Sequence, residues 1–437
     1  MIKAIILALI LIPGFVNAED LNKSLVFEGF DEAMIKCPTR IWPEYNWTDT
    51  QVIIQDAVET LVWSGRDNSI KKLDPSVVPN ESKQSVFSFP SSMSAKTMIL
   101  IPDGSYKSTD ELLRLGMHEF FHNLIQKNWK KSGPRGTKYP QSGQPRLYRR
   151  MLFENLKAYL ISNGKDPQVL GKASFWYNKW KSEFPEEALN SADGYEGTAV
   201  YAEEVGAAIA KFGCGSEDRV LLSDAMETFK KTRGFSTTGN YFELSLEGYD
   251  IGTLSALALR FFRNDQTWFH QVAMGRTPVE ILLTNVPQVP DKIPQEIASK
   301  FEVTASKMNS EIGKFVDKPI SDYRDPKIVR IALPQKMLQS NLSPKYFVLS
   351  NLLPGAMILP MNFSLNFASD TSAVKSTAGN VFFIDPKNPC ESSLVSLVAP
   401  SEIAINGDLI TVEGKGLQGR IKFTSVKGEV GIFYCAH

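Results

Sequence analysis

The chain has 437 residues, of which 43% are hydrophobic and 22% are charged. This composition is that of a globular protein and argues against a disordered chain, and the length allows two or three domains. The 48 Lys and Arg residues balance the 48 Asp and Glu residues, so the net charge gives no electrostatic reason to expect nucleic acid as a partner.

The first residues have the pattern of a secretory signal peptide. Lys3 precedes an apolar run at 4–11, Pro13 breaks this run, and small residues follow up to Ala18. The run is too short to cross about 30 Å of hydrocarbon, and no later stretch is apolar for long enough. We therefore predict a signal peptide at 1–18, a secreted or periplasmic location, and no integral membrane segment in the mature chain.

Residues 19–105 are predicted to form an N-terminal α/β part. Runs rich in β-branched, aromatic and other apolar residues lie at 51–55, 85–89 and 97–101, and such runs are typical of strands. The run at 97–101 could be the sheet edge to which an extended peptide adds main-chain hydrogen bonds. A plain core strand explains the same residues nearly as well.

The pattern becomes helical in the next part, which we place at residues 106–318. Ser108 and Glu111 have the spacing of a capping box, in which each side chain hydrogen-bonds to the backbone of the other residue. Apolar residues follow at helical spacing. The sequence therefore predicts a helix from Thr109 to Ile125.

This predicted helix carries an H-E-x-x-H sequence at His118, Glu119 and His122. Side chains four positions apart lie on one face of a helix, so two imidazoles can reach the same ion while the carboxylate stands beside a bound water. The alternative is a pair of helix histidines that are packed or solvated without a metal.

A second helical segment, 195–201, reads Tyr-Glu-Gly-Thr-Ala-Val-Tyr. A catalytic zinc site takes three protein ligands, and two His and one Glu are one of its standard sets. With H-E-x-x-H followed by E-G-x-A-x-Y, the chain resembles the gluzincin metallopeptidases, in their thermolysin-like and aminopeptidase-like branch, over roughly 97–283. The resemblance implies a zincin-like domain, a Zn²⁺ cofactor, a peptide or protein substrate and Glu196 as third ligand. Gly197 and Ala199 would let the two helices approach closely.

The spacing of these motifs leaves two points open. About seventy residues separate His122 from Glu196, so an insertion containing helices is expected between them. Glu203 returns to nearly the same helical face as Glu196. It either orients His118 or His122 or is itself the third ligand, although the flanking Gly-x-Ala-x-Tyr favours Glu196. A solvated acidic face is the alternative interpretation of Glu203 and Glu204.

The resemblance also implies roles in catalysis. Glu119 would be the general base that takes a proton from a zinc-activated water. Tyr249 lies in a Tyr-x-x-Gly sequence similar to the tyrosine segment of these peptidases, where the hydroxyl stabilises the tetrahedral oxyanion. A core or surface tyrosine is the alternative. His270 and Tyr201 are weaker candidates for this role.

The remaining sequence suggests a loop and a second domain. Residues 127–150 are rich in Lys, Arg, Gly and Pro without an acidic residue, which indicates a solvated loop or a surface that attracts acidic substrate. A helical segment at 297–316 precedes a stretch at 319–326 that predicts a linker. Regularly spaced β-type runs then predict a small all-β sandwich at 327–437. The overall fold class is α+β.

Four cysteines in an exported chain permit two disulfides. Cys390 and Cys435 bracket the β-rich C-terminus and are the preferred pair, which leaves Cys37 and Cys214 to join early and middle segments. Free buried thiols are the alternative.

Two functions remain open at this point. The first is a secreted or periplasmic zinc-dependent peptidase that hydrolyses peptide bonds with a metal-activated water. The second is a non-catalytic recognition protein with a peptidase-like domain and a β-sandwich binding module. The sequence does not predict the oligomeric state.

Overall fold

The protein mixes helices and sheets, and its overall class is α+β. The computed structural model describes residues 22–436 with gaps at 44–46, 80–81, 83–85, 91, 95, 103–107, 130–136, 189–191, 233–243, 264–266, 339–347, 351–352, 354–355, 362–363, 370–371, 386, 391–392 and 415. The predicted signal peptide lies outside the described residues.

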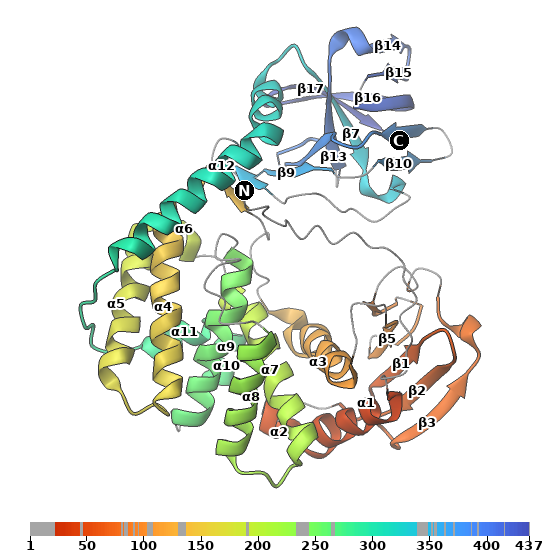
Figure 1. Cartoon of the computed structure of the whole chain (residues 1–437). Coiled ribbons are helices and arrows are strands. Elements are labelled where there is room, and N and C mark those ends of the chain that lie inside the picture. The colour runs from red at the N-terminus through yellow and green to blue at the C-terminus, as the bar shows by residue number, and fades with distance from the viewer. Residues whose placement is uncertain are drawn as a thin grey trace, which may run out of the picture.

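An N-terminal sheet of five strands follows a short helical region (Figure 1). The helical region comprises α1 (Lys23–Phe30), a π-helical turn (Asp31–Lys36) and α2 (Pro38–Ile41). The strands are β1 (Gln51–Gln55), β2 (Thr60–Ser64), β3 (Ser69–Leu73), β4 (Phe87–Ser88) and β5 (Thr97–Leu100). The sequence predicts strands in this part but not α1.

The order of the sheet is β3-β2-β1-β5-β4, with β5 parallel to β1 and antiparallel to β4. All four residues of β5 are buried, so β5 is a core strand and not the sheet edge considered above. The edge next to β5 is formed by β4. The physical reason is that three of its four residues, Met98, Ile99 and Leu100, form a continuous apolar run, as in strands covered on both faces.

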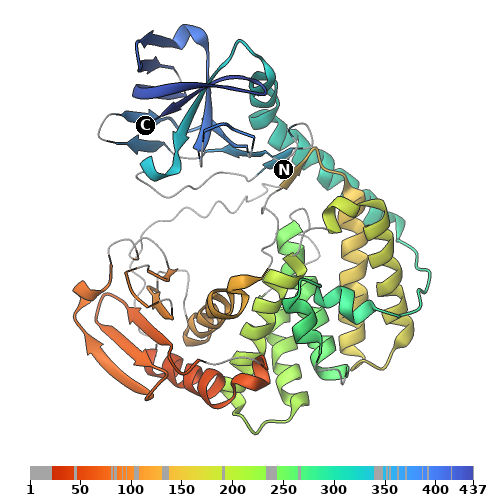
Figure 2. The ribbon, with the colours of Figure 1, turned by 180° about the vertical axis from the view of Figure 1, so that it is seen from behind.

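A helical part follows and contains the largest hydrophobic core, and Figure 2 shows its helices from behind. Its helices are α3 (Thr109–Phe120), α4 (Gly143–Ile161), α5 (Pro167–Glu183), α6 (Pro185–Ala188), α7 (Ala192–Phe212), α8 (Asp218–Thr232), α9 (Leu244–Phe262), α10 (Trp268–Ala273) and α11 (Pro278–Leu283). The helices α4, α5 and α6 fill the insertion expected between His122 and Glu196.

Glycines bring α7 and α9 into close contact. A Cβ atom on Gly197 would lie 2.4 Å from the Cα of Gly252, and one on Gly252 would lie 2.0 Å from the carbonyl oxygen of Asp193. Gly197 therefore faces α9 and not α3, contrary to the expectation from sequence. The contact between α3 and α7 instead uses Gly206, where a Cβ would lie 2.4 Å from the sulfur of Met117.

This packing predicts that Gly252→Ala lowers the free energy of unfolding by about 1–3 kcal/mol, because the added methyl group has no space between α9 and the backbone of α7. Urea denaturation measures the change. Gly215→Ala is the matched control, because a Cβ at Gly215 has nothing within 4 Å. Equal stability of the two variants would contradict the close packing of α7 and α9.

The helix α12 (Gln295–Arg324) runs through the predicted linker. Its first half contributes Phe301 to the core of the helical part, and its second half places Val316 and Ile320 on the C-terminal sheet. The linker prediction at 319–326 was therefore wrong up to Arg324. Packing of the apolar face of α12 stabilises the helix by more than the loss of the one backbone hydrogen bond that Pro319 cannot donate.

The C-terminal part has two layers of sheet joined by the long strand β16. Its strands are β7 (Val329–Pro334), β8 (Val348–Ser350), β9 (Met357–Pro360), β10 (Leu365–Ala368), β11 (Ala373–Ser376), β12 (Val381–Ile384), β13 (Ser393–Val398), β14 (Ile403–Asn406), β15 (Leu409–Glu413), β16 (Leu417–Gly428) and β17 (Gly431–Ala436). Alternate residues of one strand enter different cores: Phe382 packs between the layers, and Phe383 faces α12. From residue 327 onward the described regular elements are strands and short 3₁₀ helices, and α12, which precedes them, covers one face.

The strand β6 (Thr137–Tyr139) corrects the prediction of a solvated loop at 127–150. It pairs in parallel with β8 and so joins the C-terminal sheet. The side chain of Asn309 on α12 accepts a hydrogen bond from the backbone of Gln141 at 2.7 Å. Residues from 143 onward belong to α4, so the chain after the H-E-x-x-H helix is attached to the C-terminal part.

Both predicted cysteine pairs are disulfides. Cys37 is bonded to Cys214, and Cys390 is bonded to Cys435. The first bridge ties the segment after α1 to the end of α7, and the second ties the segment after β12 to β17. Within the described part of the chain, no helix combines the length and apolar character needed to cross a membrane.

Candidate metal centre

The H-E-x-x-H sequence lies at the end of α3, as predicted. The capping box is formed: the Ser108 hydroxyl accepts from the Glu111 amide at 3.2 Å, and the Glu111 carboxylate accepts from the Ser108 amide at 3.2 Å. The helix continues past Phe120 as a π-helical turn, Phe121–Ile125, which contains His122. Single π-helical turns are frequent at functional sites.

The structure brings His118, His122 and Glu196 together. The two Nε2 atoms lie 3.0 Å apart, and the Glu196 Oε2 atom lies 3.7 Å from the first and 3.3 Å from the second. One ligand atom from each residue can be chosen so that all three lie within 4.8 Å of one another. Ligands bound tetrahedrally at zinc distances are about 3.3 Å apart. The three side chains therefore fit a single zinc ion.

The charges in this cluster depend strongly on one another. Burial disfavours the charged imidazole, but hydrogen bonds with Glu196 and Glu203 outweigh it and raise the pKa of His118 to about 9. Burial likewise disfavours the ionised carboxylate of Glu196, yet hydrogen bonds with His118 and His122 hold its pKa far below the ordinary value. The cluster is thus a buried anionic oxygen facing imidazole nitrogens, which is a suitable environment for a divalent cation.

Glu203 lies behind the cluster. Its Oε2 atom is 3.2 Å from the Nδ1 atom of His118, on the side of the ring that faces away from Glu196. Of the two roles considered above, this geometry fits the orienting one, because a carboxylate on the outer ring nitrogen fixes the ring of a ligand histidine. Glu204 is fully buried and paired with Arg114, so the interpretation as a solvated acidic face was wrong for Glu204.

Aromatic rings pack against both histidines. Tyr249, from α9, stacks on His118 with a centroid distance of 6.0 Å and an interplanar angle of 7°. Its hydroxyl hydrogen-bonds to Glu196. Tyr195 stacks on His122 at 4.5 Å. Tyr249 is thus beside the candidate metal centre.

The other predicted residues differ in their positions. Glu119 is half-buried, and its negative charge contributes to the raised pKa of His118. His270 is exposed on α10, and Tyr201 is buried beside Trp268 in the core. Of the three residues considered for the oxyanion donor, Tyr249 is the one described here in contact with the cluster.

Buried charges hold the helices that carry the site. Arg149 of α4 donates to Asp193 at 2.8 Å and to Glu247 at 3.2 Å. Burial raises the pKa of Glu247 to about 8 despite its arginine neighbours. Asp193 precedes Glu196 by one turn on α7, and Glu247 precedes Tyr249 on α9. Arg149 therefore holds α7 and α9 together. These two helices carry Glu196 and Tyr249.

Sequence reasoning missed Gln126 and Tyr195. The Gln126 Oε1 atom lies 2.5 Å from the Nδ1 atom of His122, and the side chain is fully buried. A signal was present in the spacing, because Gln126 follows His122 by four residues and so returns to the same helical face. Tyr195 directly precedes Glu196 in the motif that identified the third ligand.

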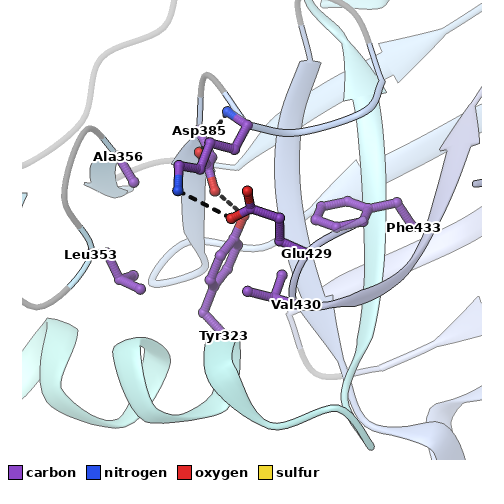
Figure 3. A pocket seen from close by; sticks show the side chains of 8 residues that line it. Tyr323, Leu353, Ala356, Asp385, Glu429, Val430 and Phe433 are labelled. Carbon is purple, nitrogen blue, oxygen red and sulfur yellow. Dashed lines mark hydrogen bonds and ion pairs between the residues drawn. The ribbon is translucent and has the colours of Figure 1, made fainter. Parts of the chain in front are cut away.

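A separate cavity of about 110 Å³ lies in the C-terminal part, between the end of α12 and the strands β12 and β17 (Figure 3). The Tyr323 hydroxyl donates to Asp385 at 2.7 Å, and Lys387 pairs with Glu429 at 3.1 Å. The polar side chains that line this cavity thus pair with one another. None of the predicted site residues lines it.

No family model, curated protein or solved structure matches this chain. The similarity to gluzincins therefore rests on the two motifs and their placement, and it stays a prediction.

Proposed function

We propose that this protein is an exported zinc-dependent peptidase of the gluzincin type. The observation that carries the proposal is the convergence of His118, His122 and Glu196 from two helices into one buried cluster. Two histidines and one glutamate leave a fourth position for water, which is the ligand set of a catalytic zinc. The two disulfides support export, because disulfides persist in oxidising compartments.

In the proposed mechanism, zinc would polarise the peptide carbonyl and lower the pKa of the attacking water. Glu119 lies one residue after His118 on the same helix. Its carboxylate would take a proton from that water and pass it to the leaving amine. The Tyr249 hydroxyl would donate to the carbonyl oxygen as negative charge develops there. Glu203 would hold the ring of His118.

A digest of a broad peptide library, read by mass spectrometry, tests this function. We expect cleavage by the purified protein, loss of cleavage after treatment with a chelator, and recovery when zinc is restored. Stoichiometric zinc without cleavage of any peptide would contradict the proposal. It would favour the alternative of a recognition protein with a peptidase-like part.

Zinc binding is expected to release about one proton at pH 7. His118 has a pKa of about 9 in the metal-free protein and must lose its proton before Nε2 can bind a metal. Apparent zinc affinity should therefore rise by about tenfold per pH unit between pH 7 and 9 and level off above. Calorimetry in buffers of different ionisation enthalpy measures the proton release. A pH-independent affinity over this range would contradict the environment described for His118.

Tyr249→Phe is expected to lower kcat by about 10²–10³-fold, because it removes the donor to the developing oxyanion. The zinc content should not change, since the phenyl ring still stacks on His118. Steady-state kinetics and metal analysis on the same sample separate the two effects. A loss of zinc with normal kcat in the loaded enzyme would instead show that Tyr249 only supports Glu196.

A further inference from the structure

The outer nitrogen of His122 has an unusual partner, the neutral side chain of Gln126. The Oε1 atom of Gln126 lies 2.5 Å from Nδ1 of His122. Gln126 begins the short 3₁₀ helix Gln126–Asn128, directly after the π-helical turn that carries His122. The corresponding partner of His118 is the carboxylate of Glu203.

The other contacts of Gln126 determine which way its amide faces. Its Nε2 atom donates to the carbonyl oxygen of Tyr195 at 2.7 Å and to the Thr198 hydroxyl oxygen at 2.8 Å. The Thr198 hydroxyl donates its own hydrogen to the carbonyl oxygen of Gly194 at 2.6 Å. Both partners of Nε2 are therefore acceptors. The amide nitrogen must face them, and the amide oxygen must face His122.

An amide oxygen only accepts, so a neutral His122 ring must carry its hydrogen on Nδ1. Its Nε2 atom, 3.3 Å from the Oε2 atom of Glu196, is then left to donate to that carboxylate when the ring is charged and to bind a metal when the ring is neutral. The stacked ring of Tyr195 restrains the same imidazole from one face. Gln126 thus links the end of the H-E-x-x-H helix to the beginning of α7.

We propose that Gln126 is a positioning residue that selects the tautomer of His122 with Nε2 available to the metal. The proposal rests on the proposed function in one respect, namely that His122 is a zinc ligand. A hydrogen-bonded partner on the outer nitrogen of a ligand histidine typically changes metal affinity by about 10–100-fold. Because Gln126 is uncharged, it does this without adding to the negative charge of Glu196 and Glu203.

The test compares Gln126→Met, which removes the acceptor at similar size, with Gln126→Glu, which keeps an acceptor. Zinc affinity is measured by competition with a chromophoric chelator. The tautomer of the neutral His122 ring is read from ¹⁵N NMR of histidine-labelled, zinc-free samples at a pH at which the ring carries one proton, which is practical because the chain has four His. Gln168→Met, at an exposed position on α5, is the matched control.

We expect Gln126→Met to lower zinc affinity by about 10–100-fold and to populate the Nε2–H tautomer. Gln168→Met should keep the parent tautomer and affinity, and Gln126→Glu should keep the Nδ1–H tautomer because its carboxylate still accepts from Nδ1. An unchanged tautomer and affinity in Gln126→Met would overturn the proposal. If the Met variant does not fold, Gln126→Glu decides, because loss of the Nδ1–H tautomer in that folded variant also overturns it. Absence of zinc binding by the parent protein would contradict the proposed function, and the tautomer measurement would still decide the role of Gln126.

Discussion

Glu119→Gln is expected to lower kcat for peptide hydrolysis by about 10²–10⁴-fold while zinc remains bound. The amide has nearly the size of the carboxylate, but it cannot take a proton from water. Glu119 contributes no ligand atom to the cluster of His118, His122 and Glu196. The variant therefore separates the proton transfer from the metal binding.

The rate is measured with the best peptide from the library digest, and zinc is measured on the same sample. Glu296→Gln is the matched control, because Glu296 is exposed on α12 and outside the site. The control should retain the parent kcat. If Glu119→Gln hydrolyses peptides at the parent rate, the assignment of the general base is wrong.

The ligand cluster could be predicted because its pattern is local. The four-residue spacing of His118 and His122 places both rings on one helical face whatever surrounds the helix. The capping box at Ser108 marked where that helix begins. Glu196 was found through its own short motif, and folding brings it to within 3.3 Å of His122.

The features that sequence reasoning missed depend on contacts between distant segments. Thr137–Tyr139 becomes a strand only because Val348–Ser350 offers a sheet edge more than two hundred residues later. Pro319 suggested a linker, whereas packing of α12 on the C-terminal sheet keeps the helix intact. Glu204 looked solvated because its partner, Arg114, lies on another helix. Contacts between such distant segments leave no periodic pattern in the sequence from which they could be predicted.

The second large effect is the loss of the metal in His118→Ala. Removing His118 leaves two of the three proposed ligands and removes the ring that faces the half-buried carboxylate of Glu203. Structural or catalytic zinc needs its full set of protein ligands, so the remaining pair should not retain the ion through purification. His270→Ala is the matched control, because His270 is exposed on α10.

Metal analysis of the purified parent, His118→Ala and His270→Ala proteins tests the central claim most directly. We expect one zinc per chain in the parent and in His270→Ala, and almost none in His118→Ala. The same zinc content in all three proteins, or no zinc in a parent protein that had been supplied with it, would contradict a metal centre at His118, His122 and Glu196.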